Sequence, residues 1–178
     1  MSKTFGILAE FDSPKSLMHV AEKIRDQGYT KWDTYSPFPI HGMDKAMGLK
    51  ESILGLIVFI GGALGLSAGF ALQTWVSTSA YKIIVSGKPL FSFQAFIPVT
   101  FEVMVLFSAF ATVFGMFFLN RLPQHYHPLF NSKKFSTATS HGFFVAIEEI
   151  DPKYNKEEVE NLLKQNGAIH LEIVEEKN

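Results

Sequence analysis

The chain has 178 residues and a net charge of −1, so it lacks the strongly basic surface that nucleic-acid binding requires. It contains no cysteine, which excludes disulfides, thiolate metal sites, Fe–S clusters and covalent c-type haem within the chain. Apolar residues make up 47% of the chain, and many lie in two long runs. We therefore expect a membrane protein that has no nucleic-acid partner.

The N-terminal segment predicts a strand, a helix and a second strand. Apolar side chains alternate over residues 5–11, as in a half-buried strand. Ser13 and Pro14 are favoured helix-start residues, and Gly28 is a typical helix end. Residues 29–35 then read as the second strand.

Two apolar runs follow, at residues 53–76 and 95–119. Each contains the roughly 20 residues that a helix needs to cross a bilayer. The flanks on the side of the termini carry five basic residues, and the intervening loop carries two. The five are Lys45, Lys50, Arg121, Lys133 and Lys134, against Lys82 and Lys88 in the loop. The positive-inside rule then predicts a multi-pass protein with both termini in the cytoplasm.

The C-terminal segment repeats the first pattern. Residues 143–150 read as a strand, and Asn155 with Glu158 resembles a capping box before a helix. Asn166-Gly167 ends that helix, and apolar side chains alternate over residues 169–173 in a last strand. Each half is too small to be stable alone, so we expect the halves to pair.

The resulting fold prediction is a membrane α-helical hairpin inserted into a split α+β ferredoxin-like sandwich, in the order βαβ–TM–TM–βαβ. The expected boundaries are 1–40 for the first half of the cytoplasmic sandwich, 41–52 for the segment leading into the membrane, 53–76 for the first transmembrane helix, 77–94 for the non-cytoplasmic loop, 95–119 for the second transmembrane helix, 120–141 for a linker, and 142–178 for the second half of the sandwich.

Small residues mark a packing face on each predicted membrane helix. Gly61, Gly65 and Gly69 recur every four residues and therefore share one face of the first helix. The second helix offers Ser108, Ala111, Thr112 and Gly115 as a matching face. Such faces let backbones approach closely. Two interpretations stay open: the helices pack only on each other, or one face also receives helices of a larger partner.

Glu102 is the one ionisable residue well inside an apolar run. An acid near the bilayer centre costs about 2.5–3.5 kcal/mol on insertion scales. It could serve as a link in a proton path, as a polar contact to a neighbouring subunit, or as an acid that is neutral or reaches the interface.

No enzyme motif is present. His125 and His127 form an H-x-H pair beside prolines, but no third ligand follows at metal spacing. His41 and Asp44 are near neighbours in a turn, where Asp44 fits a helix N-cap. We expect these four residues to be structural or interfacial, with no catalytic, cofactor-binding or metal site in the chain.

Three segments and the two-helix layout resemble one family: SPFPIHGMDKAMGLKES at 36–52, GKPLFSFQAFIPVTFEVMVL at 87–106, and LPQHYHPLFNSKKFSTATSHGFFVAIE at 122–148. The chain resembles the small two-helix D subunit of alternative complex III, the bacterial quinol:electron acceptor oxidoreductase. The resemblance covers almost the whole chain.

The resemblance implies a non-catalytic subunit of the bacterial inner membrane that supports assembly and stability of the quinol-oxidising membrane subunits. Haem c and Fe–S clusters would lie in partner subunits, and the partners would be those subunits, the lipid bilayer and, in some complexes, a terminal oxidase. Two alternatives remain: a homo-oligomeric channel or transporter accessory protein with Glu102 lining a path, and a membrane-tethered ligand sensor that uses the sandwich.

Overall fold

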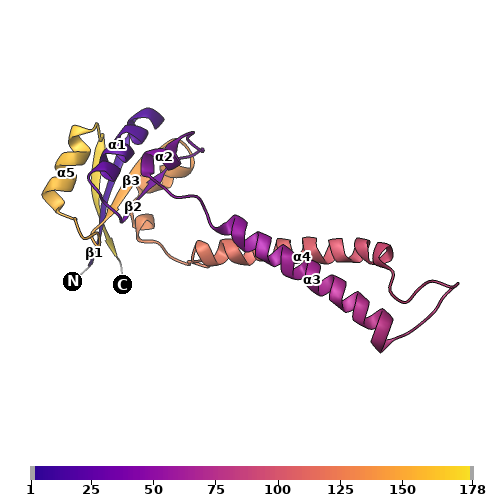
Figure 1. Cartoon of the computed structure of the whole chain (residues 1–178). Coiled ribbons are helices and arrows are strands. Elements are labelled where there is room, and N and C mark those ends of the chain that lie inside the picture. The colour runs from indigo at the N-terminus through magenta and orange to yellow at the C-terminus, as the bar shows by residue number, and fades with distance from the viewer. Residues whose placement is uncertain (1–2, 177–178) are drawn as a thin grey trace. The chain divides into compact units, whose positions relative to one another are not determined.

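The computed structural model describes residues 3–176, which divide into two compact units. One unit combines the chain up to residue 50 with the chain from residue 125 onward, and it contains a β-sheet with helices (Figure 1). The other unit, residues 51–124, is a helical hairpin. The first unit is therefore made of two segments that are far apart in the sequence.

The sheet unit has four antiparallel strands in the order β2-β3-β1-β4. Its elements are β1 (Lys3–Phe11), α1 (Pro14–Asp26), β2 (Trp32–Tyr35), β3 (Phe143–Glu148), α5 (Lys156–Gln165) and β4 (His170–Glu176). The predicted strand–helix–strand order of each half is confirmed. The second strand is shorter than predicted and begins at Trp32, because the backbone N–H groups of Thr30 and Lys31 donate to the Asp151 carboxylate.

Both predicted helix starts are capped by the expected side chains. The Ser13 hydroxyl accepts a hydrogen bond from the Ser16 backbone N–H at 3.3 Å. The Asn155 side-chain oxygen accepts one from the Glu157 N–H at 3.1 Å. Gly28 follows α1 with φ of +79°, a conformation that glycine adopts without steric cost. These local signals fix the two helices independently of each other.

The main core lies between the sheet and the helices α1 and α5. The side chains of Ile7, Ala9 and Phe11 point to this face from β1, which is the strand that pairs with both β3 and β4. Leu17 from α1 and Leu163 from α5 are fully buried against them. Each helix alone would leave its apolar stripe exposed, so the core requires both halves of the chain.

The opposite face of the sheet is covered by two short 3₁₀ helices, η2 (Pro128–Asn131) and η3 (Lys134–Thr139). Every third residue of this segment is buried, namely Leu129, Ser132, Phe135 and Ala138. That spacing matches the three residues per turn of a 3₁₀ helix. Residues 128–139, which the sequence analysis assigned to a linker, therefore form a layer of the sheet unit.

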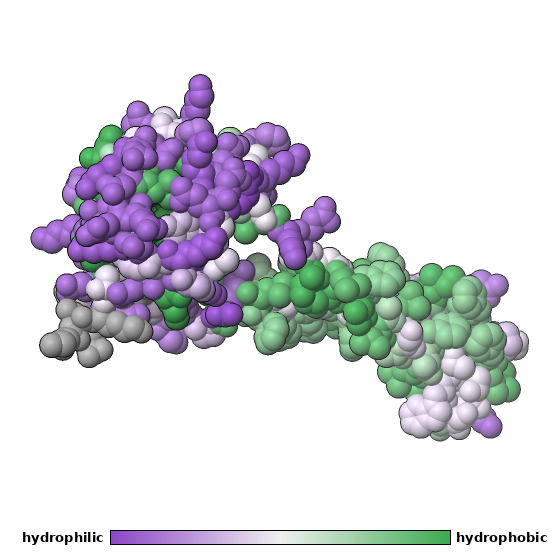
Figure 2. All heavy atoms as spheres, turned by 60° about the vertical axis from the view of Figure 1, so that its left-hand side comes forward, coloured by the Kyte–Doolittle hydropathy of each residue, from purple (hydrophilic) through white to green (hydrophobic). Residues whose placement is uncertain are grey.

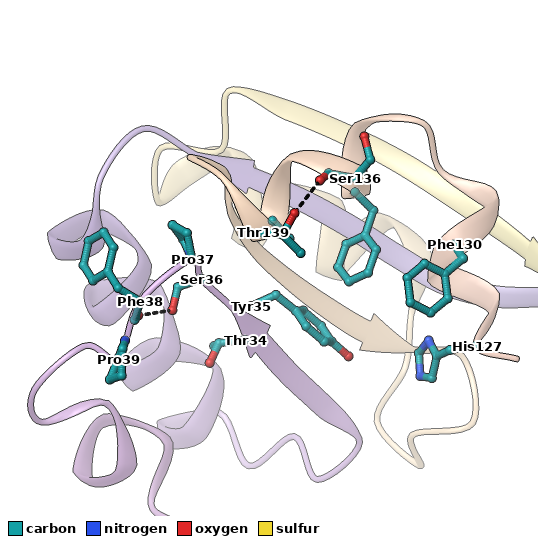
Figure 3. Close-up of a pocket in the computed structure, with 12 residues that line it drawn as sticks. Thr34, Tyr35, Ser36, Pro37, Phe38, Pro39, His127, Phe130, Ser136 and Thr139 are labelled. Carbon is teal, nitrogen blue, oxygen red and sulfur yellow. Dashed lines mark hydrogen bonds between the residues drawn. The ribbon is translucent and has the colours of Figure 1, made fainter. Parts of the chain in front are cut away.

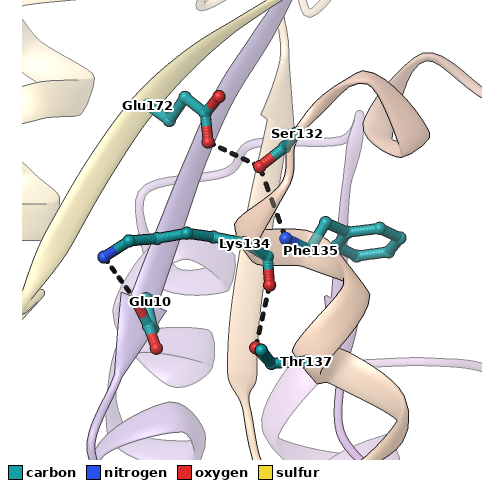
Figure 4. A network of polar contacts seen from close by, with 6 residues as sticks. All are labelled: Glu10, Ser132, Lys134, Phe135, Thr137 and Glu172. Atoms are coloured by element: carbon teal, nitrogen blue, oxygen red, sulfur yellow. Dashed lines mark hydrogen bonds and ion pairs between the residues drawn. The ribbon is translucent and has the colours of Figure 1, made fainter.

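Polar contacts attach this layer to strands β1 and β4 (Figure 4). The Ser132 hydroxyl donates a hydrogen bond to Glu172 and accepts one from the Phe135 backbone N–H. The Lys134 ammonium lies 3.4 Å from the Glu10 carboxylate. We call residues 128–139 the cover. The cover is thus bound to strands from both ends of the sequence.

A buried carboxylate joins the two halves at the other end of the sheet unit. Asp151 accepts hydrogen bonds from the backbone N–H groups of Thr30 at 2.6 Å and Lys31 at 2.7 Å, and from that of Lys153 at 2.8 Å. Burial raises the pKa of Asp151, but these donated hydrogen bonds outweigh it and hold the pKa below its ordinary value. The ionised carboxylate is the form that stabilises this junction.

The short helix α2 (Met43–Met47) begins differently from the prediction. Asp44 was expected to be its N-cap, but the cap position is Gly42, and no side chain caps the helix. Gly42 has φ of +87°, in the left-handed region that Asp and other L-residues adopt at a steric cost. The turn therefore needs glycine two residues before Asp44, and Asp44 falls in the first helical turn.

The second unit is an antiparallel pair of helices, α3 (Leu54–Trp75) and α4 (Phe93–Leu119). A π-helical turn, η1 (Val76–Ala80), extends α3, so the apolar helix ends four residues beyond the predicted boundary. Both helices are long and apolar enough to cross a membrane. Figure 2 shows apolar residues over most of the visible hairpin surface and polar residues over most of the sheet unit.

Candidate subunit-interaction site

The glycines of α3 lie against α4. A Cβ atom added to Gly61 would lie 2.5 Å from the Ala111 Cβ, and one added to Gly65 would lie 2.8 Å from the Val103 carbonyl oxygen. A Cβ added to Gly69 would lie 3.1 Å from the Val103 Cβ. The spaces at Gly61 and Gly65 are closed to any larger side chain unless neighbouring atoms move, and the space at Gly69 is tight. The face that carries the three glycines is thus occupied within the hairpin.

The small residues of α4 divide between two directions. Ser108 faces α3, because its hydroxyl would lie 2.6 Å from a Cβ on Gly62. Gly115 also faces α3, where an added Cβ would lie 3.0 Å from Leu54 Cδ1. Thr112 is exposed, and its hydroxyl donates to the Ser108 carbonyl within the same helix. Ser108, Ala111 and Gly115 therefore form the α3-facing surface, without Thr112.

Gln73 makes the polar contact between the two helices. Its side-chain amide nitrogen lies 3.1 Å from the Phe96 carbonyl oxygen and 3.0 Å from the buried Thr100 hydroxyl. The same nitrogen lies 3.1 Å from the Gly69 carbonyl oxygen of its own helix. Sequence reasoning missed this residue. The signal was available, because Gln73 continues the four-residue spacing of the glycines on the same helix face.

Glu102 lies on the opposite side of α4 from the contact with α3. Its neighbours Thr100 and Val103 meet Gly69, whereas Glu102 itself is exposed. Within residues 3–176 no hydrogen bond or ion pair of its carboxylate is found. It stands about 14 Å along the helix from Phe93. The hairpin alone therefore does not satisfy this acid.

The four candidate interface residues are all in the sheet unit, but they do not form one site. His41 and Asp44 flank the Gly42 turn and are exposed. His125 is exposed, whereas the His127 ring packs edge-to-face on Phe5 with centroids 5.3 Å apart. Among the described residues, no group of three or more His, Asp or Glu side chains could hold a metal ion.

His127 has a second position-specific role at the start of η2. Its Nδ1 atom accepts a hydrogen bond from the Leu129 backbone N–H at 3.4 Å, which caps the 3₁₀ helix. The ring nitrogen Nε2 is then the one that carries the proton in the neutral imidazole. The H-x-H pair thus places one histidine in the structure of the cover and the other on the surface.

A groove of about 620 Å³ lies beside His127 on the covered face of the sheet. Its aromatic wall consists of Tyr35, Phe130 and Phe135. The ring centroids of Tyr35 and Phe135 are 4.9 Å apart. Ser36, Ser136 and Thr139 supply hydroxyls at its rim (Figure 3). Its surface is mainly apolar, which suits an apolar side chain or ligand more than a charged one.

The groove holds one strongly perturbed group, the phenol of Tyr35. Burial raises the pKa of Tyr35 well above its ordinary value, and the nearby carboxylates of Asp33 and Glu148 raise it further. The phenol therefore stays protonated across the physiological range and cannot act as a base there. This chemistry fits a packing or binding surface.

The chain matches a protein-family model described as "Alternative complex III, ActD subunit" over residues 5–173. That range includes both halves of the sheet unit and the whole hairpin. A comparison with curated proteins gave no match. Because the matched range covers nearly the whole chain, the protein belongs to the ActD subunit family of alternative complex III, a family of membrane-complex subunits.

Proposed function

We propose that this chain is a non-catalytic integral subunit that supports assembly and stability of the quinol-oxidising membrane subunits of alternative complex III. The observation that carries this proposal is the hairpin surface. Outside the α3–α4 contact it is apolar, and Glu102 is an unsatisfied acid within it. Such a surface suits contact with lipid and with the helices of neighbouring subunits.

The described polar groups support a structural role. The buried carboxylate of Asp151 is engaged by backbone N–H groups, and His127 caps a helix. The Gln73 side-chain amide donates hydrogen bonds to α4 within the hairpin. We infer that the haem and Fe–S cofactors of the complex belong to partner subunits and that this chain carries none. A terminal oxidase is a further candidate partner.

We also propose that the sheet unit is a ferredoxin-like sandwich divided by the hairpin. Its strand order and the antiparallel pairing of β1 with β3 and β4 support that assignment. The family and the two apolar helices support a multi-pass subunit of the bacterial inner membrane. The distribution of basic residues supports the placement of both termini in the cytoplasm. A cysteine placed at Thr4 would then resist a membrane-impermeant maleimide in intact cells and react after lysis.

The assembly role is tested by deleting the gene and by extracting tagged protein gently from its native membrane. Native gel electrophoresis with haem staining should show the tagged chain in a large haem-bearing band. Deletion should reduce the amount of that band while the quinol oxidation rate per haem in the remaining complex stays near wild type. A small, haem-free species in the wild type, or full assembly without the chain, would contradict the proposal.

One observation favours a second function, the binding of a small apolar ligand in the groove at Tyr35. A sensor of this kind would show a higher melting temperature in the presence of its ligand, since binding stabilises the folded state. A screen of apolar metabolites against the purified complex measures this. The Tyr35→Phe variant is the conservative control, because it keeps the aromatic wall and removes the hydroxyl.

A further inference from the structure

The face of α4 directed away from α3 has a composition of its own. We call it the outer stripe; its members repeat at alternating steps of four and three residues and are all exposed. They are Ala95, Val99, Glu102, Leu106, Ala109, Val113 and Met116. Although α4 contains eight phenylalanines, none lies in the outer stripe. The stripe therefore combines small and branched side chains with one acid.

This composition suits packing against a helix. Alternating steps of four and three place side chains along a single seam, as in left-handed helix pairs. Alanine at two positions of the seam permits close approach in a bilayer. The phenylalanines at other exposed positions, such as Phe101 and Phe114, are bulky and apolar. The outer stripe is therefore a face of α4 without phenylalanine, on a helix whose other exposed positions carry several.

Glu102 determines the chemistry of the helix that would pack against the outer stripe. The acid lies at the level of Gly69, nine residues after the start of α4 and six residues before the end of α3, so it is about 9–14 Å inside the helices. A lipid headgroup would have to enter the hydrocarbon to reach it. A second copy of this chain, related by a two-fold axis through the stripe, would bring a second Glu102 to the same place, and like charges repel. A basic side chain on another transmembrane helix satisfies the carboxylate without either cost.

We propose that the outer stripe of α4 is the contact face for a transmembrane helix from a different subunit, and that this helix presents a lysine, arginine or histidine to Glu102. The inference rests on the proposed function, because it requires this chain to be part of a larger membrane complex. It names the contact face and the chemistry of the partner. It also assigns Glu102 to subunit contact instead of proton transfer.

Photo-cross-linking in the native complex tests the contact. The probe is p-benzoylphenylalanine, placed at Val99 or Leu106 in the stripe and at Phe101 or Phe114 as controls outside it. The stripe positions should give a protein adduct with one other subunit, and the control positions should give at least about tenfold less of it. Adducts with lipid alone at Val99 and Leu106, or equal protein adducts at all four sites, would overturn the proposal.

Charge substitution tests the chemistry. Glu102→Gln keeps the size of the side chain, and Glu102→Lys reverses the charge; neither touches the α3 contact. Detergent-washed complexes should retain about tenfold less of either variant than of the wild type. After the cross-link identifies the partner helix, exchanging its basic residue for Glu should restore retention of the Glu102→Lys variant. Wild-type retention of both variants would overturn the role of Glu102.

The two proposals fail in different ways. If the wild-type chain is absent from the haem-bearing complex, the proposed function is wrong and the outer stripe has no partner there. If the wild type is present and assembly depends on it, but the stripe gives no protein adduct and tolerates both substitutions, only the present inference is wrong.

Discussion

The Asp151 carboxylate accepts a hydrogen bond from the Thr30 backbone N–H at 2.6 Å, and it thereby joins residues that are 121 positions apart. The hairpin lies between them in the sequence. A side chain of the second half thus satisfies backbone donors between α1 and β2 in the first half. One carboxylate makes these contacts, so a single substitution removes them.

Asp151→Ala should lower the free energy of unfolding of the sheet unit by about 3 kcal/mol, because it leaves several backbone donors without their ionised acceptor. Trp32 reports on this unit, since its ring packs on the core. Fluorescence-detected denaturation in a Trp75→Phe background measures the loss, because the chain has two tryptophans. An unchanged free energy of unfolding would show that the Asp151 contacts make no net contribution to stability.

Acid should weaken the same junction. The pKa of Asp151 is below its ordinary value in the folded protein, so its stabilising contribution is complete above about pH 4. The contribution disappears as the pH falls from about 4 through the lowered pKa. The melting temperature of the wild type should therefore fall more steeply below pH 4 than that of Asp151→Asn. Parallel curves for the two proteins would contradict this assignment.

Gly65→Leu should force α3 and α4 apart, because the Val103 carbonyl oxygen and the Phe107 Cβ both lie within 2.8 Å of an added Cβ. Overpacking of this kind costs about 1–3 kcal/mol or more. We expect less of the variant in the assembled complex. Gly55→Leu is the matched control on the same helix, since a Cβ there meets nothing within 4 Å. Equal assembly of the two variants would remove the packing argument.

Leu129→Ala should destabilise the sheet unit by about 2–5 kcal/mol, because this fully buried side chain fills the core under the 3₁₀ cover. The neighbouring Phe130 is 73% exposed, and Phe130→Ala should cost about 1 kcal/mol or less through its ring contact with Phe135. The same Trp32 denaturation assay compares them. Similar losses for both would mean that the cover is not part of the core.

Local sequence signals predicted the elements that depend on local chemistry. Ser13 and Asn155 cap their helices as expected, and alternating apolar residues identified β1 and β4. The role of residues 128–139 was missed because a spacing of three among Leu129, Ser132, Phe135 and Ala138 matches neither an α-helix nor a strand. Its meaning becomes visible only when the sheet face that it covers is present.

The membrane helices illustrate the same limit. Glycine spacing predicted a packing face, but it could not say which helix would occupy that face. The distances from Gly61, Gly65 and Gly69 to α4 assign it to the hairpin. The same spacing places Gln73 on that face, but its acceptors at Phe96 and Thr100 belong to the other helix and are identified only by the structure. The directions of Glu102 and its stripe likewise depend on where α3 lies.

The insertion of the hairpin between β2 and β3 sets an order of events during synthesis. β1 is the first element to leave the ribosome, yet both of its neighbours in the sheet, β3 and β4, are made after the two apolar helices. At about 5–20 residues per second, β1 waits on the order of ten seconds for its first partner. Closure of the sheet can therefore occur only after both apolar helices have been synthesised, so a folded sheet unit marks a chain whose hairpin is complete.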